Sequence, residues 1–190
     1  MVDVNWTELL AAQLSWHWAA QARPRLDGLT DDEYRFEPVP GCWSVRPAGS
    51  VGPAPQFGTG PMRIDFDFPT PVPAPVTTIA WRLSHLIVGV FGGRNARYFG
   101  GPAMDYWTYA YPATADDALA AVDAGYQRWI SGVTALTPAE LAATCREPGF
   151  EQDPMAALVL HIHREAIHHL AEIALLRDLW AHGQRSVRRG

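Results

Sequence analysis

Apolar residues recur at a spacing of three and four along four long stretches of the chain, and this pattern predicts four long helices. The first helix begins after Asn5, a residue type that caps helices, and ends near Pro24. Its apolar stripe is formed by Leu9, Leu10, Leu14 and Trp18. A second capping pattern at residues 30–33 predicts a short helical turn before Pro38.

The second long helix is predicted over about residues 77–98, and it is apolar on almost every side, which is typical of a buried helix. Its apolar residues are Ile79, Trp81, Leu83, Leu86, Ile87, Val88, Val90 and Phe91. The third long helix opens at Thr114. A short helix is expected at Thr137, because Pro138 and Glu140 follow at the positions they favour at a helix start.

The last helix is predicted from Asp153 to about His182, with Gly183 as its C-cap and residues 184–190 as a disordered tail. The chain has no internal repeat and no Gly-rich phosphate loop. Four long helices in this order predict an all-α fold, a four-helix bundle that forms one domain over residues 1–190.

Residues 38–75 form a long crossover between the first and second helices, and they contain ten of the sixteen prolines. Such a segment cannot hold a long helix. Residues 62–68 alternate apolar and charged, which is the period of a strand, so a short hairpin or an extended segment on the bundle is expected. The crossover also contains aromatic residues that predict partial packing against the helices: Trp43, Phe57, Phe66 and Phe68.

Composition narrows the class of protein. Apolar residues make up 48% and charged residues 18% of the 190 residues, which is typical of a folded globular protein. The net charge is −5 and basic residues gather only at the end of the chain, so no basic face for nucleic acid is present. Cys42 and Cys145 lack the spacing of a zinc site and are expected to be reduced thiols. Neither a signal peptide nor a membrane span is indicated, so a cytoplasmic protein is expected.

The candidate metal-binding and catalytic residues lie mainly in residues 161–169, which contain four of the seven histidines. Glu165 and His169 lie one helical turn apart and share an arc with apolar residues that should face the core: Leu158, Ile162, Ile173 and Leu176. A buried carboxylate stays ionised only when it is paired or binds a cation. The pattern therefore fits a divalent metal, and a buried Glu–His ion pair is the competing interpretation.

His85 is the candidate for a third ligand, because it lies midway along the buried second helix among Leu83, Leu86 and Ile87. A catalytic zinc-type site uses three protein ligands and keeps one position open. His85 is offset from the densest apolar stripe, and taken alone a hydrogen-bonded core histidine is the simpler interpretation.

The other histidines of the last helix have open roles. His161 lies one turn before the predicted carboxylate ligand and fits a pocket residue, a fourth ligand or a rim residue. His168 points further outward, and His163 is expected to face solvent. Glu172 is placed to orient His168 or His169 by accepting a hydrogen bond.

Two segments resemble the DinB superfamily, most of all its actinobacterial members, and the resemblance extends over nearly the whole chain. They are Trp81-Arg82-Leu83-Ser84-His85 and residues 164–178, which begin Arg164-Glu165-Ala166-Ile167-His168-His169. The resemblance implies a bundle in which one His of the second helix and two residues of the last helix hold a divalent metal. Many members have His-x-x-x-His on the last helix, whereas this chain has Glu165 at the first position. The related mycothiol-dependent maleylpyruvate isomerases use a His–Glu–His set, which implies His85, Glu165 and His169 as the ligands here.

The same resemblance implies zinc as the metal, with nickel, iron or manganese as alternatives. Characterised members include transferases that use mycothiol or bacillithiol. The expected function is therefore S-transfer or isomerisation of a small electrophile with a thiol of the mycothiol type as cosubstrate. The metal would stabilise the thiolate, and His161 or His168 would move protons.

Two other functions remain open at this point. One is metal-dependent hydrolysis of a small molecule, with Glu172 or a nearby histidine as base. The other is a non-catalytic stress-response or ligand-binding protein whose metal site is closed by His161. A small-molecule substrate and a homodimer are the expected partners, without nucleic acid or membrane. A ferritin-like di-iron centre and a zincin are excluded, because the second Glu-x-x-His motif and the His-Glu-x-x-His motif are absent.

Overall fold

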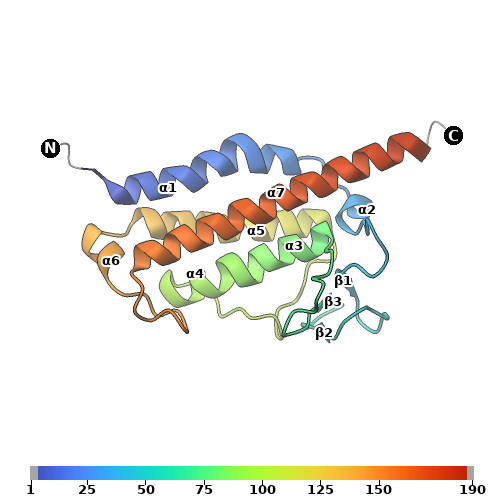
Figure 1. The fold of residues 1–190 in the computed structure, drawn as a ribbon, viewed down its shortest axis with the longest axis horizontal. Coiled ribbons are helices and arrows are strands. Elements are labelled where there is room, and N and C mark those ends of the chain that lie inside the picture. Colours follow the sequence, from blue (N-terminus) through green and yellow to red (C-terminus); the bar gives the residue numbers. More distant parts are fainter. Residues whose placement is uncertain (1–3, 188–190) are drawn as a thin grey trace.

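The structure is a computed structural model that describes the backbone of residues 4–187 and the side chains of residues 4–183, and it shows a mostly helical fold with one small sheet (Figure 1). The α-helices are α1 (Trp6–His17), α2 (Asp31–Tyr34), α3 (Ile79–His85), α4 (Gly93–Tyr98), α5 (Ala115–Thr134), α6 (Pro138–Ala142) and α7 (Met155–Val187). A π-helical segment, η3 (Leu86–Gly92), joins α3 to α4, and α1 continues through a π-helical turn (Trp18–Ala22) and a 3-10 turn (Arg23–Leu26).

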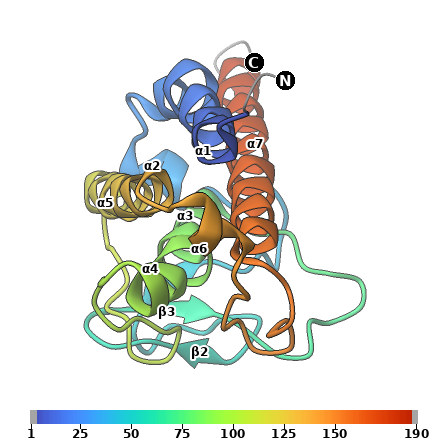
Figure 2. The ribbon, with the colours of Figure 1, turned by 90° about the vertical axis from the view of Figure 1, so that its left-hand side faces the viewer.

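The four predicted long helices pack around one core. Helix α1 contacts both α5 and α7, and the helix formed by α3 and η3 contacts the same two from the other side. Figure 2 shows this arrangement end-on, with α6 across one end and the strands below α3 and α4. The long helices therefore close a ring, in which α3 and η3 lie directly against α7.

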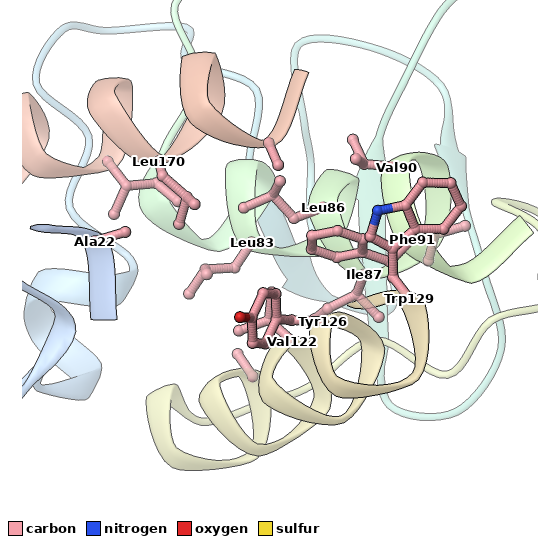
Figure 3. Close-up of a cluster of buried hydrophobic side chains, with 14 of the residues drawn as sticks. Ala22, Leu83, Leu86, Ile87, Val90, Phe91, Val122, Tyr126, Trp129 and Leu170 are labelled. Carbon is pink, nitrogen blue, oxygen red and sulfur yellow. The ribbon is translucent and has the colours of Figure 1, made fainter. Parts of the chain in front are cut away.

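The interior of this ring is apolar (Figure 3). Leu83, Ile87 and Phe91 of α3 and η3 meet Tyr126 and Trp129 of α5, and all five side chains are buried. Along α1 and the π-helical turn that continues it, the buried line is Thr7, Ala11, Leu14 and Trp18, whereas Leu9 is 48% exposed. The prediction that Leu9 belongs to the apolar stripe is therefore wrong, because the buried line follows steps of four, three and four residues and bypasses it.

The predicted helix starts are confirmed. The side chains of Asn5, Thr30, Thr114 and Thr137 each accept a backbone N–H of the first turn. The end of α7 differs from the prediction, since the helix continues through Gly183 to Val187. Gly183 does not adopt a positive φ, and a helical glycine costs only about 1 kcal/mol relative to alanine. Of the predicted tail, residues 188–190 lie outside the described residues.

The Pro-rich crossover folds into a three-stranded antiparallel sheet in the order β1-β3-β2. The strands are β1 (Val45–Pro47), β2 (Gln56–Phe57) and β3 (Met62–Asp65). The predicted strand over residues 62–68 is confirmed in its first part, where Ile64 pairs with both neighbouring strands. Phe66 packs against the core, whereas Phe68 is 84% exposed, so part of the crossover packs down as expected.

Asp65 connects this sheet to the helices, and its side chain is fully buried. The carboxylate accepts hydrogen bonds from Arg46 Nε at 2.9 Å, from the Ser44 backbone N–H at 3.0 Å and from Gln56 Nε2 at 3.0 Å. The Asp65 backbone carbonyl accepts a bond from Trp81 Nε1 at 2.7 Å. Because Trp81 belongs to α3, the crossover is tied directly to the helix that bears His85.

His163 is buried, with 4% of its surface exposed, so the prediction that it faces solvent is wrong. Its ring stands edge-on to Trp129, with the ring centroids 6.2 Å apart. Its Nε2 has no hydrogen-bond partner within the described part of the chain. Burial lowers the pKa of His163 to about 4, so the imidazole is neutral at pH 7.

We expect acid to destabilise the wild-type protein more than a His163→Gln variant. The pKa of His163 is lower in the folded state than its ordinary value of about 6.5, so the unfolded chain takes up the proton first. The contribution of neutral His163 to the free energy of unfolding is fully present above about pH 6.5. It falls by about 2–3 kcal/mol as the pH drops toward 4. Denaturant unfolding of both proteins at pH 7 and pH 4.5 measures the difference, and equal losses in the two proteins would contradict it.

Candidate metal centre

His85 and His169 come together where α3 packs against α7, and Glu165 lies beside His169. The imidazole rings of His85 and His169 are nearly perpendicular, at 89°, with their centroids 4.6 Å apart. Glu165 lies one turn before His169 on α7, and its Oε2 is 3.7 Å from Nε2 of His169. The offset of His85 from the densest apolar stripe thus turns this side chain toward α7.

In both imidazoles the Nδ1 atom is already engaged. Nδ1 of His169 lies 2.8 Å from Oε2 of Glu172, which fits an N–H that donates to a carboxylate. Nδ1 of His85 lies 2.5 Å from the hydroxyl of Tyr106. A histidine that binds a metal through one nitrogen normally forms a hydrogen bond through the other. This arrangement leaves the lone pair of Nε2 in each ring available to a metal ion. Nε2 of His169 faces Glu165.

The guanidinium of Arg82 balances the negative charge of Glu172 beside His169. Its Nη2 lies 3.0 Å from Oε1 of Glu172, and its Nη1 lies 3.2 Å from Nδ1 of His169. Partial burial raises the pKa of Glu172, but the hydrogen bond with His169 and the charge of Arg82 outweigh it and bring the pKa below its usual value. Glu172 is therefore ionised and fixes the orientation of His169, as the sequence suggested.

A second group of potential ligands lies beside the first. Among the described residues, the donor atoms of His168, His169 and Glu172 all lie within 4.8 Å of one another. However, the guanidinium of Arg82 already occupies the cationic position next to Glu172. A metal ion at that point would be repelled by Arg82, and it would compete for the Nδ1 atom that His169 uses toward Glu172. The salt bridge between Arg82 and Glu172 therefore argues against a metal in this outer group, although its donor atoms lie closest together.

His85 carries no charge at neutral pH. Burial, together with the nearby charges of His169, Arg82 and Arg94, lowers the pKa of His85 to about 3. A neutral imidazole is the form that binds a metal, because the ligand nitrogen must offer its lone pair. The residues present therefore fit a divalent cation at His85, Glu165 and His169.

A sequence profile of the DinB superfamily matches residues 13–173 of this chain. The chain belongs to the DinB superfamily. No curated protein and no solved structure matches it. The match includes His85, Glu165 and His169, and it confirms the membership of the superfamily that the second and last long helices suggested. Within residues 4–187, no helix is both long and apolar enough to cross a membrane.

Glu165 is less buried than predicted. Its side chain is 31% exposed, so the prediction of an interior carboxylate is wrong. The centre of the buried arc of α7 runs through Ile162, Ala166 and Ile173, which leaves Glu165 at its edge beside Arg164. Because the Glu165 carboxylate is in contact with water, the support for a metal comes from the two imidazoles and not from a buried charge.

The two histidines predicted to move protons lie on different sides of the centre. Nδ1 of His161 is 3.9 Å from Oε1 of Glu165 and 2.7 Å from Nη2 of Arg164. The His168 side chain is 61% exposed, and its Nε2 is 3.5 Å from Oε1 of Glu172. His161 therefore lies beside Glu165, whereas His168 lies beside Glu172 at the exposed side of His169.

A pocket of about 390 Å³ adjoins His161. Arg164 and Leu158 of α7, Arg94 of α4 and Phe150 of the loop before α7 line it together with His161. This volume and the mixture of apolar and charged groups suit a small molecule. His85, Glu165 and His169 are not among the lining residues of the pocket, and His161, one turn before Glu165, is the lining residue that connects the pocket with the candidate centre.

Aromatic side chains pack around His85, and most of these contacts were not predicted from the sequence. Trp81 stacks on the His85 ring with centroids 5.2 Å apart, and Tyr106 stacks on Phe66 with centroids 4.9 Å apart. Tyr106 and Arg82 received no role from the sequence, because a loop and a long side chain bring them to the site. The sequence feature that could have indicated a close contact here is Gly89, one turn after His85, because a glycine leaves room beside the helix.

Proposed function

We propose that this DinB-superfamily protein is a metal-dependent enzyme that uses a thiol of the mycothiol type to conjugate or isomerise a small electrophile. In this proposal the ring of long helices is the four-helix bundle of the superfamily, and His85, Glu165 and His169 hold the metal. The observation that carries the proposal is the pair of imidazoles whose Nδ1 atoms are engaged outward, at 2.5 Å and 2.8 Å, beside the Glu165 carboxylate. Zinc is the expected metal, and nickel, iron and manganese are the alternatives.

Bound there, a divalent metal would stabilise a thiolate near neutral pH. The chain supplies the surroundings for that chemistry. Trp81 covers His85 and restricts water on that side, while Arg82 binds Glu172, which orients His169. The pocket beside His161 would hold the electrophile near Glu165. In conjugation, the thiolate sulfur would form a bond to the electrophilic carbon, and the leaving group, halide in an aryl halide, would depart with the electron pair of the broken bond. In isomerisation, the sulfur would add to the carbon and leave again as thiolate after rotation about the intervening bond.

The hydrogen bond between Arg164 and His161 restricts what His161 does in this mechanism. Nδ1 of His161 accepts the bond from Arg164, so the proton of the neutral ring lies on Nε2. His161 is therefore poised to donate a hydrogen bond to the substrate. To accept a proton it must first release Arg164. His168, exposed beside Glu172, is the residue that would exchange the thiol proton with solvent.

Removal of the metal is expected to abolish thiol-dependent turnover. Protein stripped with a chelator and then reloaded with zinc would be assayed for conjugation of mycothiol to an aryl halide, with the stripped protein and a His85→Ala variant in parallel. We expect stoichiometric zinc in the reloaded protein, activity only in that sample, and none in the variant. Conjugation that survives complete removal of the metal would overturn the proposal.

The same assay separates the alternatives. A hydrolase would consume a suitable ester or amide without any thiol, although Glu172 is a poor general base while it is bound to both His169 and Arg82. A non-catalytic binding protein would retain zinc and turn over neither substrate class. Either result would replace the thiol proposal, and the metal site would remain.

A further inference from the structure

Tyr106 reaches His85 from the loop between α4 and α5. The hydroxyl lies 2.5 Å from Nδ1 of His85, and within the described residues this is the hydroxyl's only hydrogen bond. The two rings also lie nearly parallel, at 22°, with centroids 6.1 Å apart. The contact therefore joins Tyr106, a loop residue, to His85, the one proposed ligand that does not lie on α7.

The position of Tyr106 is fixed independently of His85. Its ring stacks on Phe66 of the crossover at 14°, with centroids 4.9 Å apart. Its backbone carbonyl accepts a hydrogen bond from the Tyr111 hydroxyl at 2.8 Å. These contacts come from two different segments, so the hydroxyl presents a fixed partner to the imidazole.

Gly89 makes this approach possible. It lies one turn after His85 in η3, and a Cβ atom there would collide with the Tyr106 hydroxyl and lie 3.1 Å from Nδ1 of His85. A glycine inside a helix is less stable than alanine by about 1 kcal/mol, so its presence calls for a local reason. The close approach of Tyr106 to His85 is that reason.

We propose that Tyr106 is a positioning residue of the metal centre, whose hydroxyl holds the His85 imidazole with Nε2 turned toward Glu165 and His169. The inference rests on the proposed metal site. With a metal on Nε2, the proton of the neutral ring lies on Nδ1 and is donated to the Tyr106 oxygen. Without the hydroxyl, Nδ1 of His85 loses its only hydrogen-bond partner among the described residues, and the ring is free to rotate away from the orientation that presents Nε2.

The test compares Tyr106→Phe with Tyr109→Phe. The first change removes the hydroxyl but keeps the ring on Phe66, and we expect the affinity for Zn²⁺ or Co²⁺ to fall about 10- to 100-fold, with a changed visible spectrum of the Co²⁺ protein. Tyr109 lies in the same loop, and its hydroxyl has no hydrogen bond to any described residue. Its variant should retain the wild-type affinity and spectrum. Gly89→Ala should reproduce the loss, because its Cβ would take the position of the Tyr106 hydroxyl beside Nδ1 of His85.

A second measurement needs no metal. In ¹⁵N spectra of the imidazoles at pH 7, we expect His85 of the metal-free wild type to show a single tautomer, and that of Tyr106→Phe to show averaged tautomers. Unchanged metal affinity and an unchanged His85 tautomer in a folded Tyr106→Phe protein would overturn the role of Tyr106 while the metal site stands. A wild-type protein that binds no metal at this centre would instead overturn the proposed function, and the positioning role with it.

Discussion

Substitution of either histidine of the proposed centre is expected to abolish tight metal binding. His85→Ala and His169→Ala should each lower the affinity for zinc by at least about 100-fold, because loss of a partner of a ligand alone costs about 10- to 100-fold. His169→Ala removes a nitrogen 3.7 Å from Glu165, and His85→Ala removes the ligand contributed by α3. Competition with a chromophoric chelator measures the affinities, and circular dichroism verifies that each variant is folded.

His168→Ala is the matched control, because it separates the inner centre from the outer group of His168, His169 and Glu172. His168 is exposed, and its loss should change the zinc affinity by less than about threefold if the metal lies at the inner centre. Glu165→Gln should weaken binding strongly in that case, since it removes the negative charge of the site. If His168→Ala abolished binding while His85→Ala and Glu165→Gln did not, the outer group would be the metal site and our assignment would be wrong.

The residues proposed as ligands could be selected from sequence because two of them lie on one helix. A spacing of four residues places Glu165 and His169 on the same side of α7 whatever the rest of the fold does. The apolar pattern of residues 79–91 is interrupted by Arg82, Ser84 and His85, and the resemblance to the DinB superfamily singled out His85 as the partner ligand. The structure brings that residue, His85, to within 4.6 Å of His169 by ring centroids.

The helical pattern could not place the centre of the buried arc. Periodicity gives the angle between two residues on α7, but the faces that become buried depend on where α1, α3 and α5 pack. Glu165 and His163 were therefore assigned to the wrong sides, one as interior and the other as solvent-facing. The structure leaves the first 31% exposed and the second 4% exposed.

Long-range contacts of irregular segments were the least predictable. The period of two over residues 62–68 predicted a strand, but strands as short as β1 and β2 leave no periodic pattern. For the same reason Tyr106 and Arg82 could not be assigned to the centre. The side-chain contacts of loops depend on the tertiary packing that positions them.

Loss of the Asp65 carboxylate is expected to be the most destabilising single change in the crossover. Its side chain is fully buried, and Arg46, only 19% exposed, donates to it at 2.9 Å. Removing one partner of a buried ion pair leaves the other charge uncompensated, so Asp65→Ala should lower the free energy of unfolding by about 3–5 kcal/mol. Asp65→Asn, which keeps the shape and loses the charge, should fall between the wild type and alanine. Urea unfolding followed by tryptophan fluorescence measures both.

The control for Asp65 is Glu37→Gln, which removes the other carboxylate bound to Arg46 at 2.6 Å. Because Glu37 is 33% exposed, water replaces much of its contribution, and the expected loss is below about 1 kcal/mol. Zinc affinity provides a second measure, because the backbone of Asp65 holds Trp81, and Trp81 stacks on His85. If the crossover supports the metal centre, Asp65→Asn should weaken zinc binding while Glu37→Gln should not. Equal stability and equal zinc affinity in both variants would show that the crossover lies on the helices without supporting the site.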